Sequence, residues 1–255
     1  MGIIVVRNDI TKIEADAIVN SANPKPRFLN GVDRAIYEKA GEELLKDRTR
    51  KGYMNECEVF VTNPYNLCNN NKPKIIIHVV VPKWNQDDLL MYKKLKNCYS
   101  NALDAAIEWP RSIESVAFPL LGTGVNGYPI IDAYKVAEDV CREYILSGKI
   151  KDIIICVFDN ISYKTVKEIH GSIVHFIEDE QVKLIAQHEY KEQDENGITL
   201  RLPNVYEELG IIENDYEKNI KDATNLKYDY LKMQIWTSLN YWGFILIGIR
   251  VILIK

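Results

Sequence analysis

Short apolar runs alternate with longer segments of helical periodicity through roughly the first 180 residues. The runs are rich in β-branched residues, as strands are, whereas the longer segments repeat apolar residues every three or four positions. This alternation predicts an α/β layered fold. The predicted strands are residues 3–7, 17–20, 58–62, 75–80, 115–119 and 152–158, and the predicted helices are residues 32–45, 87–108, 130–146 and 162–178.

Two of the predicted strands are apolar throughout, not only at alternate positions. Residues 75–80 read IIIHVV and residues 153–158 read IIICVF. Strands that are covered on both faces have this pattern, so we expect these two at the centre of the sheet. His78 lies within the first of them, and no second histidine or carboxylate is recognisably paired with it. We therefore predict a hydrogen-bonded core histidine and no metal site.

The pattern changes after about residue 180. Residues 187–210 are charged and turn-rich, residues 214–233 are polar with weak periodicity, and residues 241–255 read YWGFILIGIRVILIK. We predict a domain over residues 1–180 and a poorly defined C-terminal extension over residues 181–255. A membrane span needs about 20 apolar residues, and Arg250 would be costly inside one. A packing segment is therefore favoured for Tyr241 to Lys255, ahead of membrane contact or a tail anchor.

Composition narrows the function classes. Of the 255 residues, 47% are hydrophobic, and the formal charge of −4 provides no basic field for duplex nucleic acid. The five cysteines are odd in number and form no CxxC pair, which argues against a disulfide framework and a structural zinc site. The first 30 residues lack the pattern of a secretory signal. We therefore predict a protein of the reducing cytoplasm.

Glycines mark two turns where a predicted strand leads to a predicted helix, after residues 20 and 121. Amides at helix starts attract anions without any charged side chain. The second turn, GTGVNG at residues 122–127, matches the GxGxxG form of a dinucleotide site. However, it does not follow the first strand, and Asp159 lies about 30 residues on, not the usual ~20. We disfavour a Rossmann site; a glycine turn without ligand is a further alternative.

Five separated segments carry a resemblance to a known family. They are DIT at residues 9–11, ADAIVNSAN at 15–23, GVD at 31–33, IHV at 77–79 and PLLGTGVNGYP at 119–129. Their order and spacing resemble the macrodomain family, and its MacroD-type ADP-ribosyl-hydrolases most of all. The resemblance covers about residues 1–175. It implies a three-layer α/β/α sandwich with a central mixed sheet, which binds ADP-ribose or an ADP-ribosylated protein in a cleft at the carboxyl ends of the strands, with no cofactor and no metal.

The resemblance also implies roles for individual side chains. Asp33 matches the aspartate that positions or activates a water near the distal ribose, and Asn23 matches the asparagine that contacts the hydroxyls of that ribose. Asp9 matches the aspartate that accepts a hydrogen bond from adenine, with the Ile10 amide beside it. Each has a plain structural alternative: helix-dipole complementarity for Asp33, a turn before Pro24 for Asn23, and a strand-end cap for Asp9. In the first turn of its helix, Asp33 should keep a low pKa.

The remaining implied ligand contacts come mainly from backbone amides that face the diphosphate and from one aromatic ring against adenine. For the ring, a core position is an equal alternative, and Tyr163 is a second candidate. The implied set is Asn20, Gly31, Val32, Gly122, Thr123, Gly124, Val125, Asn126 and Phe158.

Two departures from the family pattern lie beside the reaction centre. Residues 24–30, PKPRFLN, replace a run of glycines, and Asn126 replaces an aromatic residue. Binding is therefore a firmer expectation than turnover. The predicted activity is hydrolysis of ADP-ribosyl esters on acidic side chains, or of O-acetyl-ADP-ribose. The alternatives are a non-catalytic module that reads ADP-ribose and, from another class, a membrane-associated scaffold. The sequence leaves the oligomeric state open.

Overall fold

The computed structural model describes residues 2–27, 31–171, 173–175, 177, 179 and 181–185. These residues belong to one compact unit, Met1–Glu192. The predicted extension over residues 181–255, with its hydrophobic tail, lies outside the described residues except for 181–185. The boundary at residue 180 therefore stays a prediction.

One seven-stranded sheet forms the middle of the described domain, in the order β3-β4-β2-β5-β6-β1-β7. Only β3 runs antiparallel to its neighbour within this sheet, so the sheet is mixed. The two apolar runs become β4 and β6, each with a neighbour on both sides, although β5 takes the middle place. The strands are β1 (Gly2–Arg7), β2 (Ala17–Ser21), β3 (Val59–Thr62), β4 (Ile75–Val79), β5 (Ser115–Pro119), β6 (Asp152–Val157) and β7 (Val174–His175).

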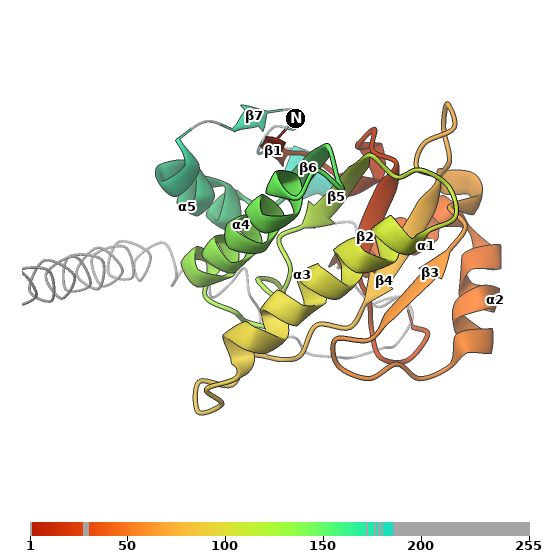
Figure 1. Ribbon diagram of the computed structural model, residues 1–255, viewed down its shortest axis with the longest axis horizontal. Coiled ribbons are helices and arrows are strands. Elements are labelled where there is room, and N and C mark those ends of the chain that lie inside the picture. The colour runs from red at the N-terminus through yellow and green to blue at the C-terminus, as the bar shows by residue number, and fades with distance from the viewer. Residues whose placement is uncertain are drawn as a thin grey trace, which may run out of the picture. The chain divides into compact units, whose positions relative to one another are not determined.

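Helices cover both faces of this sheet and complete the predicted three-layer sandwich (Figure 1). On one face pack α3 (Met91–Glu108), α4 (Ile130–Leu146) and α5 (Asn160–His170). On the other pack α1 (Gly31–Ala40) and α2 (Glu42–Lys51). Two 3₁₀ turns, η1 (Ile10–Lys12) and η2 (Tyr65–Leu67), join the second layer.

Strand alternation brings two polar side chains to the same end of the sheet. Ile18 and Ile76 belong to the core under α1 and α2, and Asn20 and His78 lie two residues further along β2 and β4. Because side chains two apart share a face, Asn20 and His78 also point toward the α1 layer. The parallel register pairs them directly.

Three helix predictions were wrong at their ends, each time because of a local backbone signal. The predicted helix over residues 32–45 is two helices, since Gly41 between them has φ of +88°. The predicted helix over residues 162–178 ends at His170 with Gly171 at φ of +84°, and the chain then forms β7. Helix α3 begins four residues later than predicted, after an Asp88 turn in which the carboxylate accepts from the Leu90 amide at 2.9 Å.

Candidate functional site

Asp33, in the first turn of α1, lies at the centre of a buried polar cluster at the carboxyl end of β2. The residue is only 3% exposed. Its Oδ1 accepts from Asn20 Nδ2 at 2.6 Å, and its Oδ2 accepts from Asn23 Nδ2 at 2.8 Å. Each carboxyl oxygen thus has an amide donor of its own. The structure therefore brings together both predicted catalytic residues and Asn20.

Burial raises the pKa of Asp33 from 3.8 to about 6, against the two asparagine hydrogen bonds and the charge of Arg48, which lower it. The expectation of a low pKa from the helix dipole was wrong, because desolvation of the carboxylate outweighs the dipole. An acid that titrates near neutral pH is a better proton acceptor than an ordinary aspartate.

This raised pKa predicts a pH-dependent stability difference between the wild type and the Asp33→Asn variant. An acid whose pKa rises on folding contributes stability that is full below about pH 4 and is lost as pH rises through about 6. The variant lacks this titration, so its free energy of unfolding relative to wild type should increase by about 1–3 kcal/mol between about pH 4 and about pH 7. Urea denaturation at both pH values measures it. A difference that does not vary with pH would contradict the shift.

Asn23 uses both hydrogens of its amide inside the protein. Besides Asp33, Nδ2 donates to the Arg27 carbonyl oxygen at 2.9 Å. The Asn23 side chain thus stabilises the turn that precedes α1, which was the structural alternative for this residue. It also holds the Asp33 carboxylate. Because both hydrogens are engaged, a ribose hydroxyl would be met by Asn23 Oδ1 as an acceptor.

Arg48 and His78 belong to the same polar cluster, although sequence patterns gave Arg48 no role and His78 only a core one. Arg48 of α2 is fully buried, and its Nη2 donates to the Asn23 carbonyl oxygen at 3.1 Å. An arginine in a polar helix gives no signal of burial, so sequence patterns alone do not identify it. His78 is a buried, hydrogen-bonded histidine as predicted, but its Nδ1 lies 3.0 Å from Asn20 Nδ2, one step from Asp33.

The glycine loop between β5 and α4 is held by bonds between its own backbone groups. Tyr128 N–H donates to Gly122 O and Gly127 N–H to Gly124 O, both at 2.9 Å. Gly122 and Gly127 have φ of +86° and +73°, which glycine tolerates best. A bond of 2.7 Å from Trp84 N–H to Asn126 O ties the loop to the segment after β4.

Backbone amides of this loop remain available for a ligand. Within the part of the chain that the structure describes, the N–H groups of Thr123, Gly124 and Val125 donate to no protein acceptor. Gly124 and Val125 are exposed, and the loop leads directly to the N-terminus of α4. Such an arrangement suits an anion. The loop between β2 and α1 contains the altered segment over residues 24–30. Residues 24–27 of that segment are described, and residues 28–30 lie outside the described residues.

Gly31 and Val32 are the first two residues of α1, directly before Asp33. Gly31 has φ of +60° and is exposed, while Val32 is half-buried against the core under α1.

The predicted adenine-contacting residues gather at the carboxyl ends of β1 and β6, which are neighbours in the sheet. Asp9 caps η1 with Oδ1, which accepts from the Thr11 amide at 2.9 Å and from its hydroxyl at 2.8 Å. Ile10 is buried, and Phe158 is half-buried directly after β6. Tyr163 already has the Arg7 guanidinium 4.5 Å from its ring centroid. Both aromatic candidates thus lie half-buried near the carboxyl end of β6.

The Asp159 carboxylate that a dinucleotide fingerprint would need serves another purpose. Its Oδ1 accepts from the Ser162 amide at 2.8 Å and caps α5. The structure thus explains this residue without a Rossmann site.

Comparison with known proteins decides the family. The Macro domain family profile matches residues 19–137. A Macro domain-containing protein of Listeria monocytogenes is 35% identical over 181 residues, which are 68% of this chain and 99% of that protein. The chain belongs to the Macro domain family.

Two further relatives place this macrodomain among proteins with named ligands or activities. The ADP-ribose glycohydrolase MACROD1 of Mus musculus is 39% identical over 158 residues, 60% of this chain and 46% of that protein. A Trypanosoma brucei macrodomain, solved in complex with ADP-ribose, has a TM-score of 0.57 and 27% identity, and the match covers 66% of this chain and 68% of that one.

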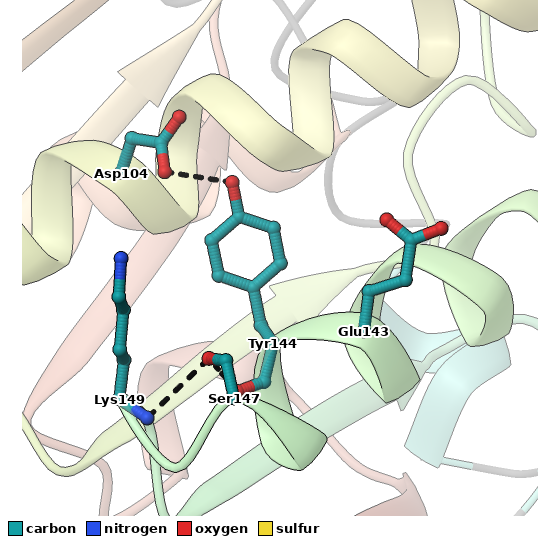
Figure 2. A pocket seen from close by; sticks show the side chains of 5 residues that line it. All are labelled: Asp104, Glu143, Tyr144, Ser147 and Lys149. Atoms are coloured by element: carbon teal, nitrogen blue, oxygen red, sulfur yellow. Dashed lines mark hydrogen bonds between the residues drawn. The ribbon is translucent and has the colours of Figure 1, made fainter.

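The surface of the macrodomain also has a small hollow of about 170 Å³, lined by Asp104, Glu143, Tyr144, Ser147 and Lys149 (Figure 2). Some of its polar groups are bonded to each other, as in the 2.7 Å bond from Tyr144 Oη to Asp104 Oδ1. The hollow lies at the C-terminal end of α4, whose 17 residues separate it by roughly 25 Å from the glycine loop. It is therefore not part of the candidate site.

No described helix of this macrodomain is both long and apolar enough to cross a bilayer. Likewise, no three histidine, cysteine or acidic side chains of the described chain are grouped to hold a metal ion.

Proposed function

We propose that this macrodomain binds ADP-ribose and hydrolyses the ester that joins ADP-ribose to an acidic side chain of a protein. The observation that carries the proposal is the buried Asp33, whose two carboxyl oxygens are held by Asn20 and Asn23. ADP-ribose as the ligand is supported by similarity to an ADP-ribose glycohydrolase and to a macrodomain solved in complex with ADP-ribose. The unused amides of the glycine loop support its diphosphate as the anion.

In the proposed reaction, Asp33 acts as a general base. It accepts a proton from water, whose oxygen then attacks the carbonyl carbon of the ester. The bond from that carbon to the ribose oxygen breaks, and the proton passes from Asp33 to the leaving oxygen. ADP-ribose thus regains its hydroxyl, and the protein regains its side-chain acid, which ionises to the carboxylate. The pKa of about 6 suits this task, because the carboxylate is ionised at neutral pH and still basic enough to help. Asn23 would fix the distal ribose through Oδ1. The same chemistry would cleave O-acetyl-ADP-ribose, and the proposed setting is the cytoplasm.

A second candidate function is a module that reads ADP-ribose without turnover. It is favoured by Asn126, whose side chain offers no ring for the distal ribose. Calorimetric titration of the full chain with ADP-ribose, followed by an assay of ADP-ribose release from an automodified ADP-ribosyltransferase, separates the two. Binding with multiple turnover supports the hydrolase. Binding without release at high enzyme concentration supports the reader, and no binding removes both.

A further inference from the structure

The hydrogen bonds behind Asp33 continue into the sheet. His78 of β4 lies 3.0 Å through Nδ1 from Asn20 Nδ2 and 3.0 Å through Nε2 from Thr62 Oγ1. Asn20 and His78 are 0% exposed and Thr62 is 4% exposed. Because bulk water does not reach these groups, each hydrogen bond that they make within the protein matters for their stability. A continuous polar chain thus runs from β3 through β4 and β2 to α1.

Asn20 determines the direction of the bonds along this chain. Its Nδ2 carries only hydrogens, so it donates one to Asp33 Oδ1 and the other to His78 Nδ1. His78 must then accept at Nδ1, carry its proton at Nε2 and donate to Thr62 Oγ1. Burial and the charge of Arg48 lower the pKa of His78 to about 3, which keeps the ring neutral.

We propose that His78 is a positioning residue that orients Asp33 through Asn20; this inference rests on the proposed function. Among the described residues, Asn20 Oδ1 is buried without a hydrogen-bond partner, so the two bonds of Nδ2 select the orientation of the amide. Without an acceptor at His78 Nδ1, only one of the two hydrogen bonds that fix the orientation of the Asn20 amide remains. A turned amide would present Oδ1 to the carboxylate and replace attraction by repulsion.

The electrostatic surroundings of Asp33 determine in which direction its pKa should change when His78 is replaced. The charged and titratable side chains around Asp33 in the described structure are Arg48 of α2 and Tyr37 of α1, with His78 of β4 behind Asn20. The Asn20 hydrogen bond lowers the pKa of Asp33, because it favours the ionised form. Weakening that bond should raise the pKa of Asp33 further.

The test compares His78→Leu with His78→Asn in the full chain. Leucine removes the acceptor, whereas asparagine keeps an oxygen at the δ position that Nδ1 occupies. We expect His78→Leu to lower kcat by about 10- to 100-fold, with little change in KM, and to move the acidic limb of the kcat/KM profile to higher pH. His78→Asn should recover most of both effects. The control is His170→Leu, which removes a histidine bonded to Tyr134 in another part of the fold. It should not change the pH at which the acidic limb of the kcat/KM profile falls.

A carboxyl-carbon NMR titration of Asp33 makes the test independent of turnover. The pKa of Asp33 should rise in His78→Leu and return in His78→Asn. If it is the same in all three proteins, or if kcat falls only as the folded fraction falls, His78 is merely structural and the inference fails. Absence of turnover in the wild type would instead overturn the proposed function, and the titration would still decide the role of His78.

A second inference rests on a different observation, two thiols that meet between the sheet edge and α3. Cys57, just before β3, and Cys98 of α3 have their Sγ atoms 3.5 Å apart. Cys57 is half-buried, whereas Cys98 is buried. The Cys57 thiol also donates to Lys94 O at 3.3 Å, and its backbone N–H donates to Val80 O at 2.8 Å. Both side chains are thus held in place, and one of them reaches solvent.

We infer that Cys57 and Cys98 form a redox modification site that closes to a disulfide with an oxidant of the peroxide class. The Cys57 thiolate attacks a peroxide oxygen and the O–O bond breaks. A sulfenic acid forms, and the departing hydroxide takes up the proton that the thiol released and becomes water. The Cys98 sulfur then attacks the sulfenic sulfur, and the hydroxyl leaves with a proton as a second water. The two thiols are oxidised and one peroxide is reduced. The sulfurs need to approach by about 1.5 Å to reach bonding distance.

The order of these steps follows from the environment of each thiol. The Cys98 S–H donates to Cys57 Sγ, which lowers the pKa of Cys57, and the same bond together with burial raises the pKa of Cys98. The thiolate that attacks first is therefore the half-buried Cys57. The proposed disulfide forms only under oxidation and is reversible. It therefore differs from the permanent structural disulfides that the cysteine pattern argues against.

Peptide mapping after hydrogen peroxide treatment and thiol alkylation of the full chain tests the second inference. We expect a Cys57–Cys98 linked peptide that dithiothreitol reverses, and a thermal midpoint raised by several degrees before reduction. The link should be absent from Cys57→Ser and Cys98→Ser, while the exposed Cys68 serves as an internal control for unpaired oxidation. The inference fails if Cys57 proceeds to a sulfinic acid while Cys98 stays open to alkylation after denaturation, or if Cys57 pairs with Cys68.

Discussion

Replacing Asp33 with asparagine is expected to lower the rate of ester hydrolysis by about 10²- to 10⁴-fold, while the affinity for ADP-ribose stays within about fivefold. Asparagine keeps the size of the side chain but cannot accept a proton from water. The glycine-loop amides proposed for the diphosphate are not touched by the change. Release of ADP-ribose under multiple turnover and calorimetric titration, both on the full chain, measure the two quantities.

The matched control for this substitution is Asp139→Asn, an exposed aspartate of α4, which should behave as wild type in both assays. Turnover that survives in Asp33→Asn would show that another group activates the water. Binding lost together with turnover would instead indicate that Asp33 organises the ligand cleft, through Asn20 and Asn23, more than it performs chemistry.

Gly122→Ala should destabilise the fold by about 2–4 kcal/mol and weaken ADP-ribose binding with it. Gly122 has φ of +86°, and an added Cβ would lie 2.6 Å from Tyr128 Cδ2. The Tyr128 ring cannot yield easily, because it is 2% exposed and its hydroxyl donates to Met91 O at 3.3 Å. The loop would have to move, and its amides with it. Urea denaturation and calorimetry measure the two effects.

Gly124→Ala, in the same loop, is the control for Gly122→Ala. A Cβ at Gly124 would meet no atom of the described chain within 4 Å, and its φ lies outside the left-handed region. Its free energy of unfolding should stay within about 0.5 kcal/mol of wild type. Equal stability of the two variants would show that the loop adapts and that Gly122 has no special conformational role.

The strands were predictable because a buried strand needs only local residues of the right kind. The apolar runs at residues 75–80 and 153–158 became β4 and β6 with ends shifted by one residue at most. Helix ends were less predictable, since Gly41 and Gly171 act through positive φ and leave the apolar periodicity intact. A glycine is a local sign that a helix can end, but the residue type alone does not show that its φ is positive.

The candidate site was predictable in its residues and not in its electrostatics. The family pattern selected Asp33, Asn23 and Asn20, which do meet. The pKa of Asp33 depends on how completely the surrounding elements bury this first turn of α1, and no local pattern measures that. The places of His78 and Arg48 in the polar cluster depend on contacts between elements that are separate in the chain. His78 is brought there by the register of β2 and β4, and Arg48 by the helix break at Gly41.

The place of β1 in the sheet has a consequence for synthesis of the chain on the ribosome. Its neighbours are β6 and β7, so Gly2 pairs with Asp152 across almost the whole described domain. At about 5–20 residues per second, β1 waits roughly 8–30 seconds for its first partner to be made. During that time its apolar side chains cannot reach their native place. Folding of this macrodomain should therefore not be complete until β6 has emerged, and β1 should stay open to chaperones until then.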